Sequence, residues 1–126
     1  YLFLHAPLLS GISMLKRILH FDETIQDADL IITGEGKMDV QTEQGKLLWG
    51  ILESAGKYHV PVVAITGNCA EQSGKMEENP LLATFPIHPA PVSLSDAMQP
   101  DYARLQVNRT IHSVIKLISF GKKTCS

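Results

Sequence analysis

The sequence predicts an α/β fold in which a parallel β-sheet is flanked by helices. Segments whose apolar residues recur at the helical period alternate along the chain with short runs that are apolar on both faces. Such runs are typical of strands in a parallel sheet that helices cover on both sides. The first two runs end in glycine turns, at Gly34 and Gly67. Because alternating strands and helices favour parallel strands joined by right-handed crossovers, we expect a Rossmann-like sheet with flanking helices.

Two helical segments are expected to precede the first strand. Apolar residues at positions 8, 9, 12, 15, 18 and 19 predict a helix over Leu8–Leu19, with Lys16 and Arg17 on its other side. Asp22–Thr24 predicts the start of one further helical turn. The apolar run Leu30–Thr33 then predicts the first strand of the sheet, which leads directly into a charged loop.

A helix and a second strand follow this charged segment, residues 33–46. Apolar residues within Leu47–Ala55 recur at helical spacing. Glu43 lies in the first turn of this helix, where the helix dipole favours an anion, and Gly56 is placed to end it. The run Val62–Thr66 predicts the second strand, again apolar on both faces.

The last part of the chain predicts a third strand and a long helix. Gly67–Pro80 is polar and predicts a loop, and the sequence LLATFPI at residues 81–87 predicts a weaker strand. Ser93 and Asp96 are spaced as a capping pair for a short helical turn. The final helix is expected to start near Asp101. Its predicted apolar face consists of Val107, Ile111, Val114, Ile115 and Ile118.

Length and composition restrict the class of protein. The 126 residues are about one domain long, and a hydrophobic content of 44% is typical of a globular protein with an apolar core. The net charge of −2 provides no basic surface for nucleic acid. Cys69 and Cys125 match neither a disulfide framework nor a zinc site, which favours a reducing cytoplasm. Since every apolar run is far shorter than the roughly 20 residues of a membrane span, no membrane partner is expected either.

The first residues indicate a fragment of a longer chain. The sequence YLFLHAPLLSG opens without methionine, inside an apolar segment. It has neither a basic stretch nor a small-residue cleavage site, so we do not expect a signal peptide. The sequence is therefore expected to be part of a larger protein, with the rest of the same polypeptide as its partner.

Ligands of open parallel sheets bind at the carboxyl ends of the strands, where both glycine turns fall. The charged loop there does not match two familiar phosphate motifs. Val40 stands at the first glycine of a P-loop and Leu47 at its Ser/Thr position, and Asp39 replaces the third glycine of a dinucleotide fingerprint. The chain also has no Gly-x-Ser-x-Gly nucleophile motif. The five histidines lack the spacing of metal ligands.

The residue types of the loop still suit phosphoryl transfer. Glu35 and Asp39 carry hard oxygen ligands that suit Mg²⁺, and either carboxylate could accept a proton from a hydroxyl group. Lys37 and Lys46 could neutralise a phosphate or carboxylate group. Phosphoryl transfer depends mainly on such positioning and charge stabilisation. The alternative interpretation is equally open at this point: loops after strands are often charged because they are solvated.

The motif ADLIITGEGKMDVQTEQGK closely resembles the signature of the glycerate kinase type 1 family, the bacterial glycerate 2-kinases. That signature reads Thr-Gly-Glu-Gly-Arg/Lys-x-Asp-x-Gln-Thr, followed by Gly-Lys. Every fixed position is met, by Thr33, Gly34, Glu35, Gly36, Lys37, Asp39, Gln41, Thr42, Gly45 and Lys46. The segments LSGISMLKRILHFDE, VPVVAITG and FPIHPAPVSLSDAM also resemble the family. Two places depart from it: Leu47-Leu48 replaces a frequent proline, and Asn68-Cys69-Ala70 follows Gly67 where a further small residue is usual.

The resemblance implies an ATP- and Mg²⁺-dependent kinase that converts D-glycerate to 2-phosphoglycerate. It also implies that residues 1–126 are the carboxyl-terminal part of a two-domain α/β enzyme, inactive alone. Asp39, Glu35 and Lys37 would be the catalytic residues, and Asp39 and Glu35 would also hold the metal. Residues that would bind substrate or phosphate are Gly34, Gly36, Gln41, Thr42, Lys46 and Gly67.

Two other functional interpretations stay open from the sequence. The chain could be a non-catalytic α/β module that binds a small sugar acid or a phosphate ligand, or a segment with a purely structural role. The sequence does not determine which glycerate hydroxyl reacts, where adenine binds or whether the protein forms a homo-oligomer.

Overall fold

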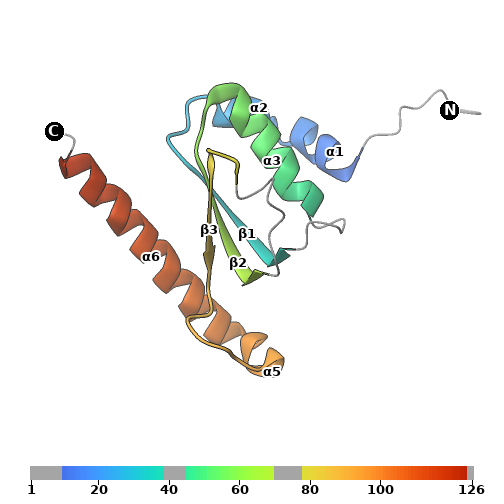
Figure 1. The fold of residues 1–126 in the computed structure, drawn as a ribbon. Coiled ribbons are helices and arrows are strands. Elements are labelled where there is room, and N and C mark those ends of the chain that lie inside the picture. The colour runs from blue at the N-terminus through green and yellow to red at the C-terminus, as the bar shows by residue number, and fades with distance from the viewer. Residues whose placement is uncertain (1–9, 39–44, 70–77, 125–126) are drawn as a thin grey trace, which may run out of the picture.

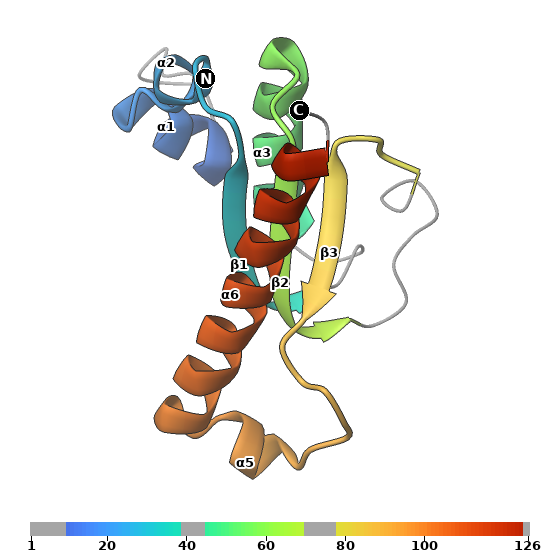
Figure 2. The same ribbon diagram turned by 90° about the vertical axis from the view of Figure 1, so that its left-hand side faces the viewer.

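The computed structural model describes residues 10–38, 45–69 and 78–124. This part of the chain contains a three-stranded parallel sheet in the order β1-β2-β3, formed by Ile31–Met38, Val62–Cys69 and Leu82–Pro86. Helix α3 (Gly45–Tyr58) lies on one face of the sheet, and the long helix α6 (Pro100–Thr124) crosses the other face (Figures 1 and 2). The predicted α/β fold with a parallel sheet and flanking helices is therefore confirmed.

The two faces of β2 are packed in two separate hydrophobic clusters, because successive side chains of a strand point to opposite faces. Val62 and Ala64 belong to the cluster on the α3 side. Val63 and Ile65 belong to the cluster on the α6 side. The fully buried helical members of the two clusters are Leu48, Ile51, Leu52 and Ala55 from α3 and Val114 from α6. This arrangement explains why β2 is apolar along its whole first half.

Two short helices precede β1. Helix α1 (Gly11–Ile18) begins after Ser10, whose side chain accepts a hydrogen bond from the backbone N–H of Ser13 at 3.2 Å. Helix α2 (Phe21–Ile25) follows as the predicted further turn. Leu8 and Leu9 of the predicted first helix lie outside the described residues, so the prediction is confirmed for residues 11–18.

The first two strands are longer than predicted, which corrects the boundary of the charged loop. We expected β1 to end at Thr33 and β2 at Thr66, but they continue to Met38 and Cys69. Glu35 pairs with Thr66 in the parallel register, and Lys37 pairs with Asn68. The two segments extend together because each satisfies the backbone hydrogen bonds of the other, which outweighs the low strand propensity of glycine and charged residues.

Helix α3 does not end at Gly56, contrary to the prediction. It continues to Tyr58, and the left-handed residue after it is His59, with φ of 57°. The backbone N–H of Val60 then bonds to the carbonyl of Ala55 at 3.0 Å. Since Val60 is 2% exposed, burial of this residue favours the tight exit at His59. Glu43, predicted in the first turn, lies outside the described residues.

The carboxyl-terminal elements follow the predictions with one correction. Helix α5 (Leu94–Ala97) begins after Ser93, whose hydroxyl accepts a hydrogen bond from the backbone N–H of Asp96 at 3.1 Å. Helix α6 starts one residue before the predicted Asp101. Val114 is buried, but Ile115 and Ile118 are 47% and 37% exposed, so the packed face of α6 is narrower than predicted. No helix in the described ranges is long and apolar enough to cross a membrane.

Candidate active site

A cavity of about 450 Å³ lies at the carboxyl half of β1 and β2, beside α6. It is lined by four of the predicted site residues: Gly34, Glu35, Gly36 and Gly67. Its other lining residues are Ile32, Thr33, Ile65, Ile87, Val107 and Ile111. The sheet thus brings together glycines that are more than thirty positions apart in the sequence, as expected for the carboxyl ends of adjacent parallel strands.

Gly34 and Gly36 help to form this cavity because glycine has no side chain to fill it. Ile31 packs in the cluster on the α3 side, so alternation along β1 places Ile32, Gly34 and Gly36 on the face that α6 crosses. A Cβ atom added at Gly34 or Gly36 would meet no other atom within 4 Å. The two glycines are therefore not required by close packing, and they leave the backbone of β1 accessible to a ligand.

Gly67 has a packing requirement that the sequence did not reveal. A Cβ atom at this position would lie 2.5 Å from the carbonyl oxygen of Gly36 and 3.3 Å from its carbon. Both obstructing atoms belong to the backbone of the neighbouring strand, so they cannot move aside without separating β1 from β2. The proposed ligand contact of Gly67 stays a prediction, and close strand pairing is a second reason for glycine there.

Glu35 is the carboxylate-bearing residue among those that line the cavity, and alternation along β1 points its side chain to the α3 side of the sheet, opposite to Gly34 and Gly36. It is partly buried, and burial raises the pKa of its carboxyl group because the charged form loses hydration. None of the side chains that the structure describes forms a salt bridge or hydrogen bond with it. A carboxylate in this state is available to bind a cation or accept a proton.

The remaining residues of the predicted loop are close in sequence to the carboxyl end of β1. Lys37 belongs to β1 and Lys46 to the first turn of α3, although the positions of their side chains are not described. Asp39, Gln41 and Thr42 lie outside the described residues. Within the described ranges, no group of three His, Cys, Asp or Glu residues could hold a metal ion. The binding of Mg²⁺ by Asp39 and Glu35 therefore stays a prediction.

A second cavity, of about 810 Å³, adjoins the first and shares Gly36, Gly67 and Ile87 with it. It is formed by residues 86–92, α5 and the start of α6, which lie beyond the arrowheads of the strands (Figures 1 and 2). His88 lines this cavity, and its ring stacks on Tyr102 with centroids 5.7 Å apart. Sequence reasoning missed His88 because its spacing from the other histidines carried no signal.

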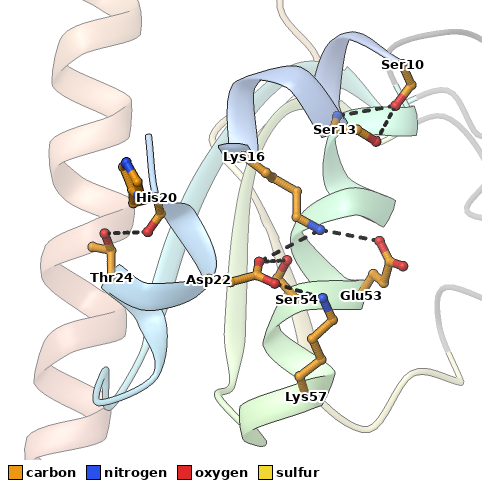
Figure 3. A network of polar contacts seen from close by, with 9 residues as sticks. All are labelled: Ser10, Ser13, Lys16, His20, Asp22, Thr24, Glu53, Ser54 and Lys57. Carbon is orange, nitrogen blue, oxygen red and sulfur yellow. Dashed lines mark hydrogen bonds and ion pairs between the residues drawn. The ribbon is translucent and has the colours of Figure 1, made fainter. Parts of the chain in front are cut away.

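A different polar cluster joins α1, α2 and α3 near the amino ends of β1 and β2 (Figure 3). Asp22 accepts hydrogen bonds from Ser54, at 2.5 Å, and from Lys57, at 2.7 Å. Lys16 donates to Glu53 at 3.3 Å and lies 3.9 Å from Asp22. The hydrogen bonds from Lys57 and then Ser54 lower the pKa of Asp22, and the bond to Asp22 raises the pKa of Lys57. These groups are occupied by one another, which indicates a structural role.

Comparison with known proteins gives matches along nearly the whole chain. Residues 1–119 match the model of the glycerate kinase family. A glycerate kinase of Bacillus subtilis strain 168 is 36% identical over 120 residues, which are 95% of this chain and 31% of the relative. A glycerate 2-kinase of Escherichia coli K12 is 33% identical over 116 residues, which are 91% of this chain and 30% of the relative.

A solved structure supports the same relationship. The crystal structure of a glycerate kinase 2 from Salmonella typhimurium LT2 superposes with a TM-score of 0.62 at 28% sequence identity. The match covers 94% of this chain and 30% of that protein. The chain therefore spans about a third of the length of the relatives that it matches.

Proposed function

Because this chain belongs to the glycerate kinase family, we propose that it forms part of a kinase that transfers the γ-phosphoryl group of ATP to D-glycerate, giving 2-phosphoglycerate. The observation that carries this proposal is the cavity lined by Gly34, Glu35, Gly36 and Gly67. Gly34, Glu35 and Gly36 belong to the motif that resembles the family signature, and Gly67 ends the segment VPVVAITG, which also resembles the family.

The carboxylates have two roles in this proposal. Asp39 accepts the proton of the attacking glycerate hydroxyl or holds Mg²⁺ against the phosphates, and Glu35 provides a second oxygen donor. The environment of Glu35 fits this role, because a partly buried carboxylate without a described cationic partner gains most from a bound cation. When bound, Mg²⁺ would neutralise charge that develops on the phosphate oxygens.

The cations and neutral polar groups position the reactants. Lys37 at the end of β1 and Lys46 at the start of α3 are assigned to phosphate oxygens or to the glycerate carboxylate. Gln41 and Thr42 are assigned to hydrogen bonds with the substrate. Gly34 and Gly36 leave the backbone of β1 open to close approach. Together these groups supply the positioning and charge stabilisation on which phosphoryl transfer depends.

The relatives are about three times as long as this chain, which limits what the isolated chain is expected to do. Since the matches cover about 30% of each relative, we assign residues 1–126 to the carboxyl-terminal part of a two-domain kinase. The other wall of the substrate cleft would then come from the rest of the polypeptide. The isolated chain is accordingly expected to bind a reactant weakly and to show no turnover.

A chimera tests the function. The 126-residue chain would replace the matching third of the Bacillus subtilis relative, and ADP release would be measured with ATP and D-glycerate. We expect release that needs both reactants, with 2-phosphoglycerate identified by phosphorus NMR. A folded chimera that binds D-glycerate without releasing ADP would instead support the non-catalytic binding module.

A further inference from the structure

His88 has an unusual polar environment. Its Nδ1 atom is buried without a hydrogen-bond partner, the one such side-chain nitrogen or oxygen within the described ranges. The ring is held in place by Tyr102 of α6, with centroids 5.7 Å apart and planes inclined by 11°. Buried polar groups are normally paired, so an unpaired ring nitrogen beside a candidate site requires an explanation.

The burial of Nδ1 indicates which nitrogen carries the proton. A buried N–H group without an acceptor is avoided more strictly than an acceptor without a donor. The favoured tautomer therefore has Nδ1 bare and the proton on Nε2. Nε2 has no partner among the described residues, but it is not among the buried unpaired atoms, so it retains access from outside. His88 thus presents a free N–H donor.

The apolar cavity around His88 strengthens the hydrogen bond that its Nε2–H group can donate. The other residues that line the cavity are glycine, proline or apolar residues, so His88 is the polar side chain of this lining. In such surroundings a hydrogen bond to a charged acceptor is stronger than in water. The cavity shares Gly36 and Gly67 with the candidate site. A ligand bound at the strand ends could therefore contact the candidate site and His88 at the same time.

We propose that His88 is a ligand-contacting residue of this site, and that its Nε2–H donates a hydrogen bond to an anionic oxygen of a reactant. This inference rests on the proposed function and extends it to the segment between β3 and α5. The oxygen belongs either to the carboxylate of D-glycerate or to a phosphate group of ATP. Both are charged acceptors, which form stronger hydrogen bonds with an N–H donor than neutral acceptors do.

Nuclear magnetic resonance on the full 126-residue chain tests the contact without any substitution. D-glycerate and inorganic phosphate would be added separately while the ring nitrogens of His88 and the amides of Gly34, Gly36 and Gly67 are observed. We expect one of the two ligands to shift Nε2 together with the glycine amides, which identifies the source of the oxygen. If the glycine amides shift while the ring does not, the role of His88 is wrong and the proposed function stands. No shift at any of these atoms with either ligand contradicts both.

Three variants separate a hydrogen bond from a merely structural effect. In His88→Gln the side-chain amide can reach the place of Nε2, whereas in His88→Asn it can reach only the place of Nδ1. We expect His88→Asn to weaken binding of the responding ligand about tenfold or more, and His88→Gln to retain most of the affinity. His112→Asn, on the exposed side of α6, is the matched control and should bind as the unmodified chain does. Equal affinities for His88→Asn and His88→Gln in folded protein would overturn the inference.

Discussion

The carboxylates near the two ends of the sheet have opposite environments: one is paired with other side chains and the other has no described partner. At the amino end, Asp22 accepts hydrogen bonds from Ser54 and Lys57 and lies 3.9 Å from Lys16. At the carboxyl end, Glu35 is partly buried beside an open cavity and has no described partner. The pKa of Asp22 is lowered mainly by its hydrogen bonds, whereas burial raises the pKa of Glu35.

This difference separates groups that stabilise the fold from groups that are available to a ligand. The cluster around Asp22 satisfies its own charges and connects α2 to α3. Neither the carboxylate of Glu35 nor the ring nitrogens of His88 have described partners, and both residues line cavities that share Gly36 and Gly67. Unpaired polar groups cost stability, so their presence at one end of the sheet is a reason to place the proposed reaction there.

The largest expected effect is on catalysis and compares two aspartates. In the chimera, Asp39→Ala should lower kcat/KM by about 10²–10³, the usual cost of losing a charge-stabilising group. Asp22→Ala should leave kcat/KM unchanged, because Asp22 belongs to the polar cluster of α1, α2 and α3 (Figure 3), and α2 lies near the amino ends of the strands (Figure 1). Steady-state ADP release measures both. If Asp39→Ala kept more than half of the rate, the assignment of Asp39 would be wrong.

The next effect is on stability and compares two glycines of the candidate site. Gly67→Ala should lower the free energy of unfolding by about 1–3 kcal/mol, because the new methyl group would collide with the backbone of Gly36. Gly34→Ala should cost nothing or stabilise the chain by up to about 1 kcal/mol, since its Cβ would enter open space. Urea unfolding of both variants provides the measurement. Equal losses would show that the close approach of β1 and β2 does not restrict residue 67.

The sequence predicted the order of elements well because the apolar pattern is strong on β2, α3 and the middle of α6. It failed at the ends of β1 and β2, where glycine and charged residues suggested a loop. The extension of both strands depends on pairing between segments distant in sequence, which local composition does not encode. It also failed at Gly56, because a buried Val60 and a left-handed His59 determine where α3 ends.

The candidate site shows the same limit. The motif identified Gly34, Glu35 and Gly36, and parallel topology correctly placed Gly67 beside them. Neither could show that a Cβ at Gly67 would strike the carbonyl of Gly36, because that depends on the spacing of two strands. His88 was missed for a related reason: its burial and its stacking on Tyr102 arise only when β3 and α6 come together.

A smaller effect tests the structural role of the cluster at the amino end. Asp22→Ala should lower the free energy of unfolding by about 1–2 kcal/mol, because it leaves the fully buried hydroxyl of Ser54 without its acceptor. Glu53→Ala is the matched control: Glu53 is 70% exposed, so losing its contact with Lys16 should cost less than about 0.5 kcal/mol. Urea unfolding at pH 7 distinguishes them. Similar values for the two variants would contradict the special position of Asp22.

The smallest effect is the pH dependence of the free energy of unfolding, to which Asp22 and Glu35 contribute with opposite signs. A carboxyl group whose pKa is lowered by folding stabilises the protein above its unfolded value of about 3.9, and this contribution is lost as the pH falls through the folded value. Asp22 is of this kind. Glu35 is the reverse: its pKa is raised by folding, so stability is greatest below the unfolded value of about 4.3 and declines as the pH rises through the folded value.

Glu35→Gln should therefore stabilise the chain slightly at pH 7, by less than about 0.5 kcal/mol, because it removes a carboxylate that is costly to ionise. The gain should disappear at pH 4, where the carboxyl group is largely protonated in the folded chain. Asp22→Asn should show the opposite sign at pH 7, since it removes a carboxylate that hydrogen bonds favour. Urea unfolding at both pH values compares the pair. A loss of stability in Glu35→Gln at pH 7 would mean that Glu35 is already paired in the ligand-free chain, so that its carboxylate would not be free to bind a cation or accept a proton.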